Sequence, residues 1–257
     1  LVARGLVASR QQAQQLIRAG KVRDGAGTVL DKPGHDVKDS VQLQVEHPPR
    51  FVSRGGEKLL AGLDAFPISV QQRICLDGGI STGGFTDCLL QHGAKRVYGV
   101  DVGYGQTAWS LRTDDRVVLR ERTNLRHLQP EGLYGEADPW PTLAVTDVSF
   151  ISLRLILPAL RRLLHGSDAE ALVLVKPQFE VGRDRVGRGG VVRDPAAHCD
   201  AIEMVITAAA ALDWFAQGIV ASPITGPAGN HEYVLWLGAN RTAPEFDLQL
   251  LVKSTLH

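Results

Sequence analysis

The sequence predicts an α/β protein in which helices cover both faces of a mostly parallel sheet, with a small module in front. Short apolar runs alternate with helical segments over residues 58–245, and this alternation is typical of parallel sheets. With 257 residues, 44% of them hydrophobic, the chain can form one large domain and a smaller one. Charge is uneven as well, because residues 1–60 contain ten basic against six acidic residues while the whole chain is neutral.

The N-terminal residues 1–46 predict the small module. In SRQQAQQLIRAGKVRDG, Ser9 can cap a helix that ends at Gly20. Two short strands are expected around TVLDKPGHDV and SVQLQV, with a turn at residues 32–34. The first 23 residues contain five basic and no acidic residues, which favours binding of a polyanion, although a solvated helix face is an alternative.

The larger domain is expected over residues 58–245, after a Pro- and Gly-containing linker at 47–57 and before a C-terminal tail at 246–257. The segment EYVLWL follows the preceding strand so closely that we expect the two to pair antiparallel. The predicted strands of this domain are residues 73–77, 96–101, 142–147, 171–177, 218–225 and 232–237.

A glycine-rich turn between a strand and a helix, LDGGISTGGFTDCLL at residues 76–90, predicts a cofactor site. The G-x-G-x-x-G pattern is absent, and Phe85 stands where a P-loop needs its lysine. Asp77 at the strand end would repel a pyrophosphate but attract a cation, and Asp101 after the next strand can accept hydrogen bonds from ribose hydroxyls. This pattern favours S-adenosylmethionine, with a ligand-free turn as the alternative. The glycines would let the backbone approach it closely. The predicted cofactor-binding residues are Asp77, Gly78, Gly79, Ser81, Gly83, Asp101 and Asn124.

Four charged residues stand at strand or helix ends: Lys58, Asp147, Lys176 and Glu232. Because burying an ammonium group is costly, lysines at these positions indicate a catalytic role. Each of the four residues alone can also be a helix cap or part of a surface ion pair. Two lysines and two carboxylates suit a ribose hydroxyl, which must lose its proton to a lysine whose pKa a nearby like charge has lowered. Base methylation fits less well, because TDVSF is not a polar-Pro-Pro-aromatic motif and no cysteine follows a strand-end proline.

Two sets of motifs resemble known families. SRxxAxxLIxxGxV followed by KPGxxV resembles the S-four-type (α-L) RNA-binding domain over residues 1–46. SRGGEKL, LDGGISTGGFTDCLL, YGVDVGYGQ, ERTNLR, TDVSFISL, VKPQFEVGR and GPAGNHEY together resemble the TlyA family. These are FtsJ-like rRNA 2′-O-methyltransferases that carry such an N-terminal domain.

The resemblance implies a Rossmann-like S-adenosylmethionine-dependent methyltransferase sheet and cytidine ribose in ribosomal RNA as the target. It also implies a Lys-Asp-Lys-Glu tetrad with Lys176 as the general base, formed by Lys58, Asp147, Lys176 and Glu232. Gly79 departs from the family, where a larger small residue is more common, and this bears on cofactor affinity. Asn124 is expected to contact the adenine or to form a turn, and Phe150 to pack in the core rather than on the cofactor.

The expected partner is ribosomal RNA, free or in ribosomal subunits. Part of the contact is expected from a Gly-rich arginine loop at 181–193, which can close on the RNA backbone or stay solvated. Three scattered cysteines predict no metal site, and no apolar run approaches the roughly 20 residues of a membrane span, so a cytoplasmic enzyme is expected. An inactive RNA-binding protein and a membrane-active haemolysin-like protein remain alternatives. The predicted RNA contacts are Arg4, Arg10, Arg18, Lys21, Arg54, Arg183, Arg185 and Arg188.

Overall fold

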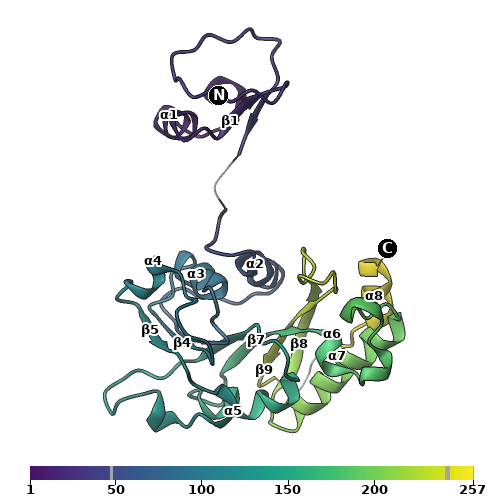
Figure 1. Ribbon diagram of the computed structural model, residues 1–257. Helices are drawn as coiled ribbons and strands as arrows, with labels where there is room; N and C mark the ends of the chain where they lie inside the picture. The colour runs from purple at the N-terminus through teal and green to yellow at the C-terminus, as the bar shows by residue number, and fades with distance from the viewer. Residues whose placement is uncertain (47–48, 241–243, 257) are drawn as a thin grey trace. The chain divides into compact units, whose positions relative to one another are not determined.

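A computed structural model of the chain describes residues 1–46, 49–240 and 244–256 (Figure 1). The chain divides into two compact units, Leu1–Arg50 and Phe51–His257. Residues 47 and 48 of the predicted linker lie outside the described residues, as do 241–243 of the predicted larger domain and 257 of the predicted tail.

The first unit contains one helix and a two-stranded sheet. Helix α1 (Arg10–Arg18) begins after Ser9, whose hydroxyl accepts a hydrogen bond from the Gln12 amide, as the capping signal predicts. Strand β1 (Val22–Asp24) pairs antiparallel with β2 (Leu43–Val45). A small cluster of buried side chains, which includes Ala13 and Leu16 of α1, holds helix and strands together.

The second unit is built on one sheet, in which seven strands of the described residues follow the order β5-β4-β3-β6-β7-β9-β8. The strands β3 to β7 run parallel to one another, and β9 lies antiparallel between β7 and β8. This confirms the mostly parallel sheet and its antiparallel end, while the short edge strand β5 was not among the predicted strands. The bounds are β3 Ile74–Gly78, β4 Arg96–Val100, β5 Val117–Arg120, β6 Leu143–Thr146, β7 Glu170–Val175, β8 Phe215–Ala221 and β9 Tyr233–Gly238.

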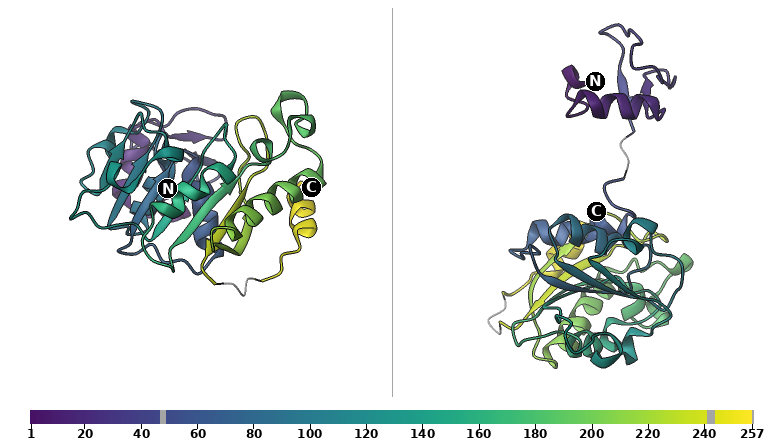
Figure 2. Two further views of the ribbon diagram at one scale, coloured as in Figure 1. Left: turned by 90° about the horizontal axis from the view of Figure 1, so that it is seen from below. Right: turned by 90° about the vertical axis from the view of Figure 1, so that its left-hand side faces the viewer.

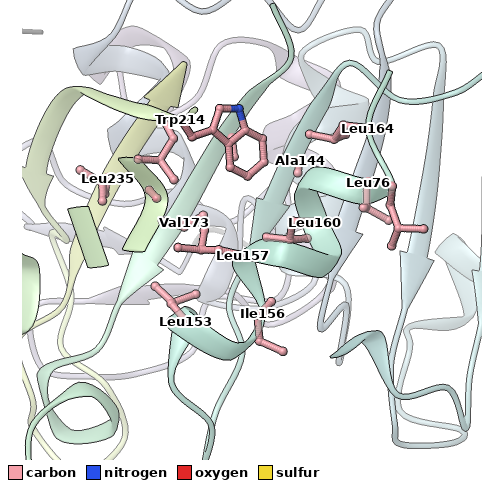
Figure 3. Close-up of a cluster of buried hydrophobic side chains, with 14 of the residues drawn as sticks. Leu76, Ala144, Leu153, Ile156, Leu157, Leu160, Leu164, Val173, Trp214 and Leu235 are labelled. Carbon is pink, nitrogen blue, oxygen red and sulfur yellow. The ribbon is translucent and has the colours of Figure 1, made fainter. Parts of the chain in front are cut away.

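Helices cover both faces of this sheet (Figures 1 and 2). Alternate residues of β7 enter opposite cores, since Val173 joins the cluster beneath α5 and α7 and Leu172 joins the one beneath α2 and α3. Figure 3 shows the first cluster, where Trp214 and the leucines of α5 lie against β6 and β7. The helices are α2 Gly55–Ala65, α3 Gly84–Gln91, α4 Trp109–Arg112, α5 Leu157–Arg162, α6 Pro177–Glu180, α7 Pro195–Ala210 and α8 Leu248–Leu256.

Both ends of the second unit contain helical or buried residues at positions where the sequence predicts a linker and a tail. Phe51 is buried in the core under α2, and α2 already begins at Gly55, inside the predicted linker. In the predicted tail, α8 packs against α7 with Val252 fully buried. Apolar side chains at these positions therefore add the segments to the larger core.

Candidate active site

The glycine-rich turn connects β3 to α3 and depends on left-handed backbone at three positions: Gly79 (φ 87°), Ser81 (φ 49°) and Gly83 (φ 101°). Gly83 has no room for a side chain, because an added Cβ would collide with Leu111 of α4. The same atom on Gly78 would lie 2.6 Å from the side chain of Leu125. Packing within the protein therefore requires these glycines, besides the close cofactor approach that the sequence predicts.

Asp77 is the next-to-last residue of β3 and is fully buried. Its Oδ2 accepts a hydrogen bond of 2.7 Å from the Thr86 hydroxyl of α3, whereas Oδ1 has no hydrogen-bond partner among the described residues. Burial raises the pKa of Asp77 to about 7, and the carboxylates of Asp147 and Asp101 add to the rise. An unpaired buried oxygen with a raised pKa favours a cationic group nearby, so the ammonium and sulfonium of S-adenosylmethionine fit this site.

Asp101, at the end of β4, braces the glycine turn. Its Oδ2 accepts from the amide of Ser81 and its Oδ1 from the amide of Gly103, each at 2.7 Å. Each carboxylate oxygen can accept a second hydrogen bond, so Asp101 can still bind ribose hydroxyls. Asn124 is exposed and caps a short 3₁₀ turn by accepting from the Arg126 amide, which is the turn role among its two predicted roles.

The four residues of the predicted tetrad lie together, although they span 174 positions from Lys58 to Glu232. Lys58 comes from the start of α2, and Asp147, Lys176 and Glu232 stand directly beyond β6, after β7 and before β9. Lys58 Nζ lies 2.6 Å from Glu232 Oε2 and 3.5 Å from Asp147 Oδ2, and Lys176 Nζ lies 2.6 Å from Asp147 Oδ1. The result is a row of alternating charges, Glu232–Lys58–Asp147–Lys176.

This row is shielded from water. Lys58 and Lys176 are each 7% exposed and Glu232 is 1% exposed, so their charges interact in a low-dielectric environment. Asp147 is the more open member, with 21% of its side chain exposed. Asp147, the partner of Lys176, is therefore the member through which the row reaches solvent.

Ser149 is a contact of Lys176 that the sequence analysis missed. Lys176 Nζ donates a hydrogen bond of 2.7 Å to its hydroxyl, and Ser149 is exposed. The next residue, Phe150, is 91% exposed with φ 64° and lies beside Phe179, with ring centroids 5.3 Å apart. The prediction that Phe150 packs in the core was wrong, because β6 ends at Thr146 and Phe150 belongs to the loop beyond it.

The predicted RNA-binding residues differ in how far their charges are already paired. Arg10 and Arg18 on α1, Arg54 before α2, and Arg183 and Arg188 in the arginine loop are exposed. Other members of the set have partners within the protein. Arg4 donates to backbone carbonyls, including that of Asp39 at 3.0 Å, Lys21 pairs with Glu46 at 2.6 Å, and Arg185 pairs with Asp194 and Asp200.

The described residues contain no group of three or more His, Cys, Asp or Glu placed to hold a metal ion. No disulfide bond joins Cys75, Cys88 and Cys199 in the described part of the chain. Within the described part of the chain, no helix has the length and apolar character needed to cross a membrane.

The fold and the site define an S-adenosylmethionine-dependent methyltransferase. The chain belongs to the FtsJ-like methyltransferase family, whose model matches residues 51–239. It is 52% identical over 240 residues to the 16S/23S rRNA (cytidine-2′-O)-methyltransferase TlyA of Mycobacterium tuberculosis, covering 92% of this chain and 87% of the relative. It is 40% identical over 230 residues to Hemolysin A of Brachyspira hyodysenteriae, covering 90% and 94%.

A solved structure supports the same assignment. A candidate hemolysin from Streptococcus thermophilus is 41% identical and superimposes with a TM-score of 0.75, covering 97% of this chain and 91% of that one. Some similar proteins are therefore named for methylation and others for haemolysis. The residues of the site are the evidence that distinguishes these two functions for this chain.

Proposed function

We propose that this enzyme methylates the 2′-hydroxyl of a cytidine ribose in ribosomal RNA. The observation that carries the proposal is the buried row Glu232–Lys58–Asp147–Lys176, which ends at the same sheet edge as the glycine-rich turn. The relative from Mycobacterium tuberculosis, which is named for this reaction on 16S and 23S rRNA, supports the choice of substrate. With ribosomal RNA as the substrate, the enzyme acts in the cytoplasm.

S-adenosylmethionine supplies the methyl group when bound, and it would be held by Asp77, Asp101, Asn124 and the glycine turn that includes Ser81. The chemistry that the bound cofactor would supply is a methyl carbon for the 2′-oxygen, with S-adenosylhomocysteine as the leaving group. Lys176, in its neutral form, takes the hydroxyl proton on Nζ. The positive charge that then forms lies 2.6 Å from Asp147 Oδ1, which stabilises it.

The other two members of the row orient the base. Lys58 lies between Asp147 and Glu232, so it fixes Asp147 from the side opposite Lys176. Glu232 is buried and paired with Lys58, which anchors the row to the start of β9. Lys176 therefore faces the acceptor from a position that three charged side chains maintain.

Binding of the RNA is proposed to involve both units. We infer that residues 1–46 form an S-four-type RNA-binding domain, joined through residues 47–57 to a methyltransferase domain at 58–245 with the segment 246–257 behind it. Ribosomal RNA or a ribosomal subunit would contact exposed arginines of both units, whereas Arg185 would first have to leave its two aspartates. The proposed RNA contacts are Arg4, Arg10, Arg18, Lys21, Arg54, Arg183, Arg185 and Arg188.

Methyl transfer from labelled S-adenosylmethionine to unmodified ribosomal RNA and subunits, followed by nucleoside digestion and mass spectrometry, tests the proposal. We expect 2′-O-methylcytidine from the wild type and none from Lys176→Ala, with cofactor affinity retained because Lys176 is proposed to act on the acceptor. Lys253→Ala, at an exposed lysine of α8, is the matched control and should keep full activity. A methylated base, or turnover by Lys176→Ala, would contradict the assigned base.

The two other candidate functions predict different results in the same experiments. An inactive RNA-binding protein would bind RNA without any methylated product. A membrane-active protein would release dye from liposomes. We expect methylated product and no dye release.

A further inference from the structure

We propose that Glu180 is a positioning residue that holds the loop carrying Asp147 and Ser149 in register with Lys176. The inference rests on the proposed function, because it assigns a role toward the general base. Glu180 ends the short helix α6, whose N-terminal neighbour is Lys176. It is 3% exposed, although a carboxylate is costly to bury.

The loop 147–153 is fixed to the β7–α6 segment at two places. At its beginning, Lys176 contacts Asp147 at 2.6 Å and Ser149 at 2.7 Å. At its end, Glu180 Oε2 accepts from the Ser152 hydroxyl at 2.6 Å and Glu180 Oε1 from the Leu153 amide at 2.7 Å. Both contacts therefore start from one short stretch of chain, residues 176–180.

The loop between these two places is strained. Phe150 has φ 64°, a conformation that costs a non-glycine residue on the order of 1 kcal/mol. Its side chain is 91% exposed, so burial of this ring does not hold the backbone in place. The hydrogen bonds of Glu180 after Phe150 and the contacts of Lys176 before it hold the backbone on both sides of this conformation.

Glu180 is satisfied as a hydrogen-bond acceptor rather than as half of a close ion pair. Arg154 Nε lies 3.6 Å from Glu180 Oε2, farther away than the hydroxyl and amide donors. Burial raises the pKa of Glu180, and its hydrogen bonds to Ser152 and Leu153 counteract that rise. A side chain of the same shape that can accept one of these two bonds should therefore preserve part of the function.

This reasoning defines a set of variants. Glu180→Ala removes both hydrogen bonds, and Glu180→Gln keeps an oxygen for the Leu153 amide. Ser152→Ala removes the hydroxyl bond to Glu180, together with the two hydrogen bonds that this hydroxyl accepts from Arg154. Glu203→Ala, at an exposed glutamate of α7, is the matched control. Each full-length variant would be assayed for kcat, for KM with unmodified ribosomal RNA, for S-adenosylmethionine affinity and for the pH profile of kcat.

We expect kcat to fall roughly 10- to 100-fold in Glu180→Ala, since a misplaced base costs about this much, and roughly two- to fivefold in Glu180→Gln and Ser152→Ala. KM and cofactor affinity should change less than about twofold, and the pH profile of kcat should move in Glu180→Ala alone. The double variant Ser152→Ala/Glu180→Gln should lose less than the product of the two single losses, because both single changes alter the same contact between Ser152 and Glu180.

The inference is wrong if the wild type is active while Glu180→Ala retains its kcat and pH profile, or if Glu180→Gln is as impaired as Glu180→Ala. Should Glu180→Ala fail to fold, the Gln and Ser152 variants still decide, because unchanged kcat in both contradicts the proposed contact. A wild-type enzyme that makes no 2′-O-methylated product would instead reject the proposed function itself.

Discussion

The buried ion pair between Lys58 and Glu232 gives a prediction that separates stability from catalysis. We expect each single replacement, Lys58→Met or Glu232→Gln, to destabilise the protein strongly and to abolish methyl transfer. The double variant should recover most of the stability and none of the activity. The reason is that a lone buried charge is costly, whereas two neutral side chains of similar shape are not.

The size of the effect follows from the geometry. At 2.6 Å and an effective dielectric constant of about 20, the pair attracts by about 6 kcal/mol before the cost of desolvation is subtracted. Removing one partner of such a pair costs about 3–5 kcal/mol. Glu232→Gln should lie near the lower end, because Lys58 keeps Asp147 at 3.5 Å. Lys58→Met should lie near the upper end, because Glu232 is only 1% exposed and loses its partner.

Urea unfolding of the wild type, both single variants and the double variant gives the coupling free energy, which we expect to be about 3 kcal/mol or more. The pair Arg116–Asp114, at 2.7 Å on the surface, is the control and should couple by less than about 1 kcal/mol. Single variants that unfold like the wild type would refute the description of this pair as buried and coupled. An active double variant would refute a catalytic need for it.

Three further predictions follow from the cofactor turn and the first unit. Because burial raises the pKa of Asp77 to about 7, cofactor affinity should rise up to about tenfold per unit from pH 6 to 7 and level off above, as titration calorimetry can show. In the free protein, the unfolding free energy should fall as the pH rises from about 4 to about 7, because the Asp77 carboxyl holds its proton more tightly in the folded state than in the unfolded state. Asp77→Asn should remove both the pH dependence of cofactor affinity and this pH dependence of stability. Replacing Arg10 and Arg18 together by Gln should weaken RNA binding and lower the slope of log affinity against log salt by up to about 2, and an unchanged slope would exclude both contacts. Gly83→Ala should lower the unfolding free energy by about 2–4 kcal/mol in thermal melts, because the added methyl group strains the backbone and collides with Leu111 of α4. Gly105→Ala is the control, since Gly105 also has a positive φ but open space around it, and it should cost only about 1 kcal/mol.

The arrangement of the tetrad was predictable from the sequence because of a topological rule. Parallel strands end at one edge of the sheet, so charged residues that follow apolar strands, such as Asp147 and Lys176, are brought together whatever their separation in the chain. The strands themselves were predictable because both faces are buried, which makes them continuous apolar runs. Strand β5 has only the short apolar run at residues 117–119, and its place at the edge of the sheet leaves these three residues half-buried and Arg120 exposed.

The remaining parts of the site depend on contacts that no local pattern encodes. Arg185 looks like a phosphate-binding residue in a Gly-rich loop, but folding places Asp194 and Asp200 against its guanidinium. The same loop is fixed elsewhere by Asn230, which accepts a hydrogen bond from the Val192 amide at 3.0 Å. The positions of charged residues in a sequence therefore indicate where a polyanion can be attracted. Which of these charges are already paired within the protein depends on the fold.

The glycine-rich turn shows how packing and binding share one set of residues. Gly83 is needed for a left-handed turn against α4, and Asp101 holds the amides of Ser81 and Gly103. These contacts fix the turn before any cofactor binds, so the entropy of ordering it is lost on folding rather than on binding. Asp77 behaves differently, because its unpaired oxygen and raised pKa show a cost of burying the charge that either a proton or a bound cation relieves. Folding thus fixes the geometry of the turn, and the bound cofactor would supply the positive charge that the buried carboxylate of Asp77 needs.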